Sequence, residues 1–192
     1  MACNVHFFRN YLTGGIVVAG SILAAGCGTH TSAGSGQAAS AAPATHGPAT
    51  AAATAACSSS NLRISLGVGG AAAGTDFTVL DFTNGGSAPC TLRGFPGVSL
   101  ADSTGAQIGA AATRNPVRPS TLVTLAPGAK ASAELGVANA ENYPAEACKP
   151  TSSARLRVFP PNQTVAIEVP FAATGCAASS AHQLSVTAVT AG

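Results

Sequence analysis

The six cysteines are the residues of this sequence with the most varied chemistry. Cys3 and Cys27 lie in an apolar N-terminal segment, and the other four, Cys57, Cys90, Cys148 and Cys176, are spread along the rest of the chain. Zinc sites use close cysteine pairs, typically about two to four residues apart, and these four lie much further from one another. An even number of widely spaced cysteines is typical of disulfides in an exported domain. We therefore predict an oxidising compartment.

Three pairings of the four cysteines are possible, and the strand pattern favours one of them. Alternating or β-branched apolar residues predict two hairpins: residues 62–68 with 77–83, and residues 155–158 with 165–169. Cys57 and Cys90 bracket the first hairpin, and Cys148 and Cys176 bracket the second. The second strand of a hairpin returns to where the first began, so we predict the disulfides Cys57–Cys90 and Cys148–Cys176.

The remaining pattern is also that of short strands. Asn84-Gly85-Gly86, residues that accept positive φ, end one strand, and Pro127-Gly128 forms a turn between two others. One short helical turn is possible within residues 138–147. The further strands are expected at 98–100, 107–108, 121–125, 130–137 and 184–189. Residues 57–192 are therefore predicted to form an all-β domain, a two-sheet antiparallel sandwich of immunoglobulin-like type with two disulfides.

Residues 1–26 have the composition of an export signal. A short start with one basic residue, Arg9, precedes about fifteen nearly uncharged residues, fewer than the roughly twenty that span a bilayer. The run Leu23-Ala24-Ala25-Gly26-Cys27 resembles the lipobox of bacterial lipoproteins, with Ala24 at the position that most often holds leucine. This resemblance implies lipidation of Cys27 after cleavage. The alternatives are secretion after cleavage elsewhere and an uncleaved anchor.

Residues 27–56 follow as a predicted stalk. Beyond Cys27 this segment holds only Ala, Thr, Ser, Gly, Pro, His and Gln, with no charge and no large apolar side chain. Such a segment has too little apolar surface to offset the entropy of ordering its backbone. We predict a disordered tether, in which His30 and His46 could ligate a metal in principle but are expected to be bystanders.

Enzymatic templates fit the predicted domain poorly. His182 is its one histidine, the Gly-x-Ser-x-Gly and Ser-x-x-Lys signatures are absent, and the glycine-rich run at 67–72 leads into a strand rather than a nucleotide-binding helix. The acidic residues are scattered, although folding could bring two of them together: Asp76, Asp81, Asp102, Glu134, Glu141, Glu146 and Glu168. We predict no catalytic residues.

No cofactor or metal is predicted either. Blue-copper sites need two histidines, a free cysteine and commonly a methionine, and the only methionine is the initiator. The nearest candidate for a calcium site is Glu141-Asn142 with Glu146 in one loop. We expect these to be ordinary loop residues rather than calcium ligands.

Phe82 to Val98, with Cys90-Thr91-Leu92-Arg93-Gly94-Phe95-Pro96 at its centre, resembles the signature of a domain family of unknown function found in actinobacterial exported lipoproteins. The turn at Leu125-Ala126-Pro127-Gly128 and the segment 156–161 are similar to its other recurring blocks, in the same order. The resemblance covers roughly Cys57 to Val189. It implies a fold and a location, and no chemistry.

A contact surface remains as the most reasonable functional feature. Arg93, Arg155 and Arg157 could meet carboxylates or phosphates, and Tyr143 could anchor an interface or pack on its own domain. Only 8% of the residues are charged, with 9 basic and 7 acidic, which argues against nucleic-acid binding. We expect a non-catalytic lipoprotein, held at the extracytoplasmic face of the cell membrane, that binds or organises an envelope protein or wall polymer. The alternative is an accessory cell-wall hydrolase or transferase that uses carboxylates assembled by folding.

Overall fold

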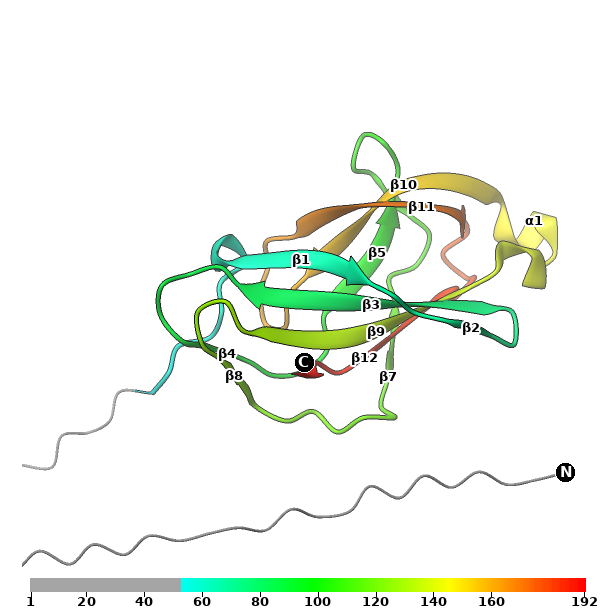
Figure 1. Ribbon diagram of the computed structural model, residues 1–192. Helices are drawn as coiled ribbons and strands as arrows, with labels where there is room; N and C mark the ends of the chain where they lie inside the picture. The colour runs from blue at the N-terminus through cyan, green and yellow to red at the C-terminus, as the bar shows by residue number, and fades with distance from the viewer. Residues whose placement is uncertain (1–52) are drawn as a thin grey trace, which may run out of the picture. The chain divides into compact units, whose positions relative to one another are not determined.

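The computed structural model describes residues 53–192, which form a mostly β domain (Figure 1). A 3-10 turn, η1 (Ser59–Asn61), precedes the first strand, and a second, η2 (Ala140–Asn142), is followed by the single helical turn α1 (Ala145–Cys148). The strands are β1 (Leu62–Gly67), β2 (Ala71–Ala72), β3 (Thr75–Asn84), β4 (Cys90–Leu92), β5 (Gly97–Ala101), β6 (Gln107–Ile108), β7 (Thr113–Asn115), β8 (Val123–Leu125), β9 (Lys130–Ala138), β10 (Pro150–Phe159), β11 (Ile167–Cys176), β12 (Leu184–Thr187) and β13 (Thr190–Ala191).

These strands form three sheets. The largest has the order β1-β3-β9-β12-β7, with β2 paired to β3 and β13 paired to β9. The second has the order β11-β10-β5-β6, and β4 and β8 form a separate pair. β12 and β7 run parallel, so the purely antiparallel arrangement expected from the sequence is wrong. β7 pairs with β12, a strand distant in sequence, and local periodicity cannot predict the partner or direction of such a pairing.

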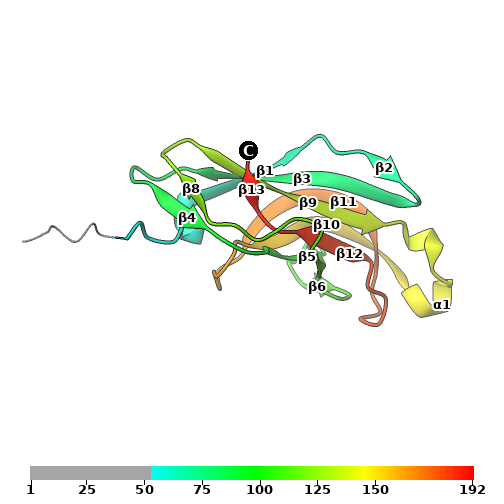
Figure 2. The same ribbon diagram turned by 90° about the horizontal axis from the view of Figure 1, so that it is seen from below.

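The two larger sheets contribute to one core. Leu80 and Phe82 of β3 are fully buried and belong to the same apolar cluster as Leu100 of β5 and Leu156 and Val158 of β10. Strands alternate their side chains between two faces, and the observed register places Leu80 and Phe82 opposite small buried alanines of β9. Full burial of each large aliphatic or aromatic side chain contributes about 1.5–3 kcal/mol. Figures 1 and 2 show the two sheets lying over one another.

Both predicted disulfides are present. Cys57 bonds Cys90, and Cys148 bonds Cys176, across sequence separations of 33 and 28 residues. The first attaches the N-terminal end of the domain to β4, and the second joins the end of α1 to the end of β11. Two views at right angles place α1 at one end of the domain and the β4–β8 pair at the other (Figures 1 and 2).

The ordered domain begins slightly before Cys57. Ala56 bridges Thr91 in parallel, and the carbonyl of Ala55 accepts a hydrogen bond from the Thr91 N–H at 2.9 Å. These two alanines were expected to belong to the stalk, but backbone pairing extends the domain to include them. The predicted signal peptide, Cys27 and the stalk up to residue 52 lie outside the described residues. Within residues 53–192, no helix is both long and apolar enough to cross a bilayer.

The structure differs locally from two expectations, although β3 ends at Asn84 as predicted. The strand expected at 165–169 begins at Ile167 and continues to Cys176, while Val165 lies before it and is 65% exposed. Asn84, Gly85 and Gly86 do not adopt positive φ. Asn84 is instead 1% exposed, and its side-chain amide donates to the carbonyls of Ala88 and Leu125 at 2.9 and 3.0 Å. Side-chain hydrogen bonds rather than left-handed backbone therefore end β3. The short helical turn expected within 138–147 is present as η2 and α1.

Candidate functional site

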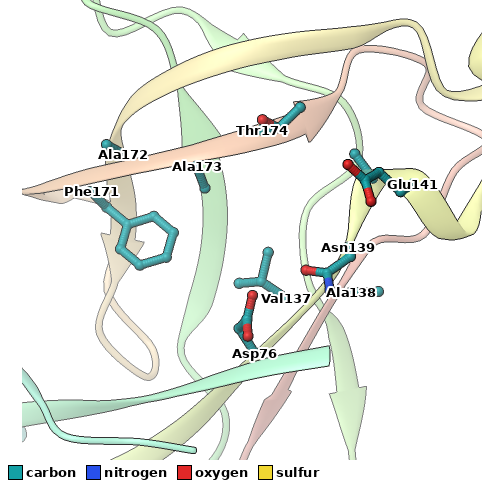
Figure 3. Close-up of a pocket in the computed structure, with 10 residues that line it drawn as sticks. Asp76, Val137, Ala138, Asn139, Glu141, Phe171, Ala172, Ala173 and Thr174 are labelled. Atoms are coloured by element: carbon teal, nitrogen blue, oxygen red, sulfur yellow. The ribbon is translucent and has the colours of Figure 1, made fainter. Parts of the chain in front are cut away.

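A cavity of about 420 Å³ opens between the two larger sheets, near η2 (Figure 3). It is lined by Asp76 of β3, by the end of β9 at Val137 and Ala138, by residues 139–141, and by residues 171–174 of β11. Figure 3 shows the ring of Phe171 and the carboxylate of Asp76 projecting into this space from opposite sides. The cavity therefore combines an apolar wall with acidic groups.

Two turns that hydrogen-bond to each other hold the acidic groups. The β3 register places Asp76 opposite Val137 of β9, a few residues before Glu141 in η2. The carbonyl of Gly74 accepts hydrogen bonds from the Asn139 N–H and from the Asn142 side-chain amide, both at 2.8 Å. These bonds tie the turn that precedes β3 to the turn that carries Glu141, so both carboxylates face one cavity.

Gln183 fixes the end of the cavity nearest the Cys148–Cys176 disulfide. Its side-chain oxygen accepts from the Cys176 N–H at 2.8 Å, and its amide donates to the carbonyls of Ala138 and Thr174 at 2.8 and 2.9 Å. Gln183 is 6% exposed, and these bonds satisfy both N–H donors of its amide. The amide thus joins β9 to β11 where the two strands line the cavity.

A bulge in β11 positions Phe171. Ser153 of β10 pairs with Ala173 and Arg155 pairs with Pro170, so Phe171 and Ala172 together lie opposite one residue of β10. The Ser153 hydroxyl accepts from the Ala173 N–H at 3.2 Å and lies 3.3 and 3.2 Å from the carbonyl oxygens of Phe171 and Ala173. Bulges bend a strand and redirect a side chain, which accounts for the ring of Phe171 facing the cavity.

Two of the predicted contact residues, Arg155 and Arg157, lie elsewhere, on the outer face of the β10 sheet. Arg155 and Arg157 share that face, as their spacing predicts. Arg155 is engaged within the domain: it forms an ion pair with Glu168 at 2.6 Å and donates to the Ser103 carbonyl at 2.9 Å. Arg157 stacks over the ring of Phe159 at 5.7 Å from its centroid. Of the two guanidinium groups, that of Arg157 is the better placed for an external anion.

Arg93 and Tyr143 lie near opposite ends of β10. Arg93 is exposed, and its carbonyl accepts from Asn162 in the turn after β10. Tyr143 precedes β10, packs against a small cluster around the Cys148–Cys176 disulfide and donates its hydroxyl to the His182 carbonyl at 3.3 Å. Tyr143 therefore packs on its own domain, and the side chain of His182 is exposed. The structure does not unite the four predicted contact residues into one site.

Among the acidic residues, Asp76 and Glu141 line one cavity, whereas Asp102 organises a local turn after β5. Asp102 accepts from the Thr104 hydroxyl at 2.6 Å and from the backbone N–H groups of Thr104 and Ala106 at 2.8 and 2.9 Å. The hydrogen bond from Thr104 is the main cause that holds the pKa of Asp102 below its ordinary value. Within residues 53–192 no three His, Cys, Asp or Glu side chains lie close enough to hold a metal. Asn142, which lies beside Glu141 in the candidate calcium loop, donates its side-chain amide to the Gly74 carbonyl.

Comparison with known proteins gives one result. No curated protein and no solved structure matches the chain. Residues 57–190 match the family model described as Domain of unknown function (DUF4232), which covers the β domain from Cys57 to the first residue of β13. Since this match spans well over half of the sequence, the chain belongs to the DUF4232 family of domains of unknown function.

Proposed function

We propose that the chain is a non-catalytic lipoprotein, anchored through Cys27 at the extracytoplasmic face of the cell membrane, whose β domain binds an envelope protein or wall polymer. The lipobox-like sequence at Leu23–Cys27 and the short apolar segment before it support the anchor. The two disulfides support an oxidising location, because reducing compartments keep most thiols free.

The cavity between β9, β11 and η2 is the observation that carries the binding proposal. It joins an aromatic ring, exposed strand backbone and two carboxylates within about 420 Å³, a size in the range of ligand sites. Among its lining residues in the described chain there is no histidine, cysteine or serine that could form a nucleophile–base pair. This lining supports binding over catalysis by a serine or cysteine nucleophile, and the two carboxylates are considered below as a second candidate.

The immunoglobulin-like sandwich remains the architecture that we propose for the domain. The shared core of the two larger sheets supports it, because facing sheets of a sandwich bury alternate residues against one another. The parallel β12–β7 pair and the separate β4–β8 pair depart from the simplest form of that architecture. Such a domain would present the cavity on a rigid scaffold at the end of its tether.

Site-specific photocrosslinking in intact cells tests the binding proposal. A photoreactive amino acid replaces Ala172 in the cavity, and in a matched control it replaces Val117, which is 71% exposed on the β7–β8 connection. We expect adducts with an envelope protein or wall polymer from position 172 and not from position 117. Equal adducts from both positions, or none from position 172, would contradict the proposal. Cys27→Ser tests the anchor separately: the protein should lose its acyl label and leave the membrane fraction.

The second candidate is a cell-wall hydrolase or transferase, favoured by the one observation that Asp76 and Glu141 line the same cavity. Paired carboxylates serve as acid and base in glycoside hydrolysis. Both side chains are exposed, whereas general-acid catalysis by a carboxyl group relies on a desolvated setting. Release of fragments from purified wall polymer by the full chain, lost in Asp76→Asn and Glu141→Gln, would establish this alternative. If no fragments are released, the enzymatic alternative is rejected and the binding proposal stands.

A further inference from the structure

We infer that the cavity takes an extended, cationic segment of a partner protein, which pairs with the free edge of β11 as an added strand. This inference rests on the proposed binding function and specifies the chemistry of the partner. It follows from the position of β11, the direction of its backbone groups and the charge of the cavity lining.

β11 is an edge strand. In the order β11-β10-β5-β6 it has β10 as its only neighbour within its sheet. An unpaired edge presents N–H and C=O groups to which another extended chain can bond, and several peptide-binding domains use this mode. Residues 171–174 of this edge also line the cavity, so a chain added there would lie against it.

The contacts of Ser153 show which groups of β11 face outward. Its hydroxyl lies at hydrogen-bond distance from the Phe171 carbonyl and from both the N–H and the carbonyl of Ala173, all of which therefore point toward β10. A carbonyl and the N–H that follows it point to opposite sides of a trans peptide. The N–H and carbonyl of Ala172 and the N–H of Thr174 consequently point away from β10, along the edge.

Gln183 already bonds to this edge as a neighbouring strand would. Its amide accepts from the Cys176 N–H and donates to the Thr174 carbonyl, which are outward groups two residues apart. Gln183 therefore covers the edge on the Cys176 side, and Pro170, which has no N–H, limits pairing on the other side. The open stretch, Phe171–Thr174, is short. Together with the bulge, these features protect β11 from self-pairing over its length and leave room for a brief segment of a partner.

The charge of the lining selects a cationic segment. Asp76 and Glu141 face the cavity, and no Lys or Arg is among its lining residues in the described part of the chain. Alternate side chains of an added strand would point into the cavity. A lysine or arginine there would meet both carboxylates, with its aliphatic stem against the ring of Phe171. An acidic side chain would meet like charge instead.

Selection from a library of random nonapeptides displayed on phage, with the full chain as target, tests this inference. We expect the selected peptides to carry Lys or Arg. The strongest is synthesised, together with a version in which Gln replaces each basic residue, and affinities are measured by fluorescence anisotropy. Removal of the peptide charge, or the double change Asp76→Asn with Glu141→Gln, should weaken binding about tenfold or more.

Backbone pairing is tested by Thr174→Pro, which removes an N–H that faces away from β10 and so leaves the native ladder intact. Thr174→Ala is the matched control. We expect the proline variant to lose about tenfold or more in affinity and the alanine variant to stay within about threefold. In the unaltered chain, the peptide should also slow hydrogen exchange of the Ala172 and Thr174 amides, a measurement that does not depend on any variant folding.

Each other outcome overturns the inference. Selected peptides without basic residues would refute the cationic partner, and unchanged exchange at Ala172 and Thr174 would refute strand addition. If the charge variants weaken binding but amide exchange is unchanged, the cavity binds by another mode, and the proposed function stands without this inference. If no peptide binds and position 172 gives no crosslink in cells, the proposed function fails as well.

Discussion

Gly74 is the residue on which the arrangement of the two acidic turns depends most directly. Its φ is +72°, and a Cβ there would lie 2.8 Å from the Asn142 amide nitrogen that donates to its carbonyl. Gly74→Ala should therefore lower the free energy of unfolding by about 1–3 kcal/mol, from left-handed strain and loss of that hydrogen bond. Urea unfolding under oxidising conditions measures the change.

The control for Gly74→Ala lies in the same hairpin. Gly70 has open space around the position of a Cβ, and its φ is not positive. Gly70→Ala should change stability by no more than about 0.5 kcal/mol. Equal destabilisation by the two substitutions would show that any added side chain destabilises this hairpin and that the contact with Asn142 is not the cause.

Gln183 shows how one buried amide can join two strands. Gln183→Leu keeps a similar volume but leaves the Cys176 N–H and the carbonyls of Ala138 and Thr174 without this partner. Loss of hydrogen bonds at buried groups should lower the free energy of unfolding by more than about 2 kcal/mol. His182→Ala, next to it and exposed, should stay within about 0.5 kcal/mol. Thermal or urea unfolding of both variants distinguishes a specific amide role from general sensitivity of this loop.

At the scale of elements, the turn between β5 and β6 is organised by one carboxylate. The Thr104 hydroxyl and nearby backbone N–H groups favour the charged form of Asp102, so its pKa lies below that of the unfolded chain. Its contribution to stability is present above the unfolded pKa and is lost as pH falls through the lower, folded pKa. The Thr104 and Ala106 amides should therefore lose protection against hydrogen exchange as the pH falls below the ordinary range of an aspartate, whereas amides of β9 keep theirs. Asp102→Asn should remove this pH dependence, and its persistence in that variant would assign it to another group.

Longer strands were predictable because their apolar residues alternate. Leu62, Ile64 and Leu66 on β1, and Ala131, Ala133 and Leu135 on β9, each lie on the core-facing side, as their spacing indicates. β2, β4, β7 and β13 are not predicted, because strands of two or three residues carry too little period to be recognised reliably; β6 and β8, which are equally short, are predicted. Their pairing partners, such as β8 for β4, are chosen by tertiary contacts.

The cavity could be predicted only in part. The sequence shows that folding could place two carboxylates on one site, but the position of Asp76 and Glu141 on the same cavity depends on the register between β3 and β9. That register places Asp76 opposite Val137 and is fixed along the length of both strands by core packing. The structural roles of Gln183 and Ser153 could not be predicted, because a polar residue in a β-rich segment is expected to face solvent unless its buried hydrogen-bond partners are known.

For the whole molecule, the two disulfides secure opposite ends of the domain and should have separable effects. Each closes a loop of about 30 residues, so its loss should cost about 2–5 kcal/mol of stability. The Cys148–Cys176 disulfide lies at the end of β11, the strand whose edge lines the cavity, whereas Cys57–Cys90 holds the N-terminal end of the domain against β4. The double variants Cys57→Ala/Cys90→Ala and Cys148→Ala/Cys176→Ala should thus be similarly destabilised.

Only one of these double variants should disturb the cavity. Without Cys148–Cys176, the end of β11 is still connected to β9 through the hydrogen bonds of Gln183. Local opening of this end should then require less free energy than global unfolding. Hydrogen exchange measured by mass spectrometry should accelerate over residues 167–176 in this variant, and over residues 55–61 and 90–92 in the other. If both variants loosen β11 equally, the domain opens as one cooperative unit. The cavity would then draw its rigidity from the whole core and not from the disulfide beside it.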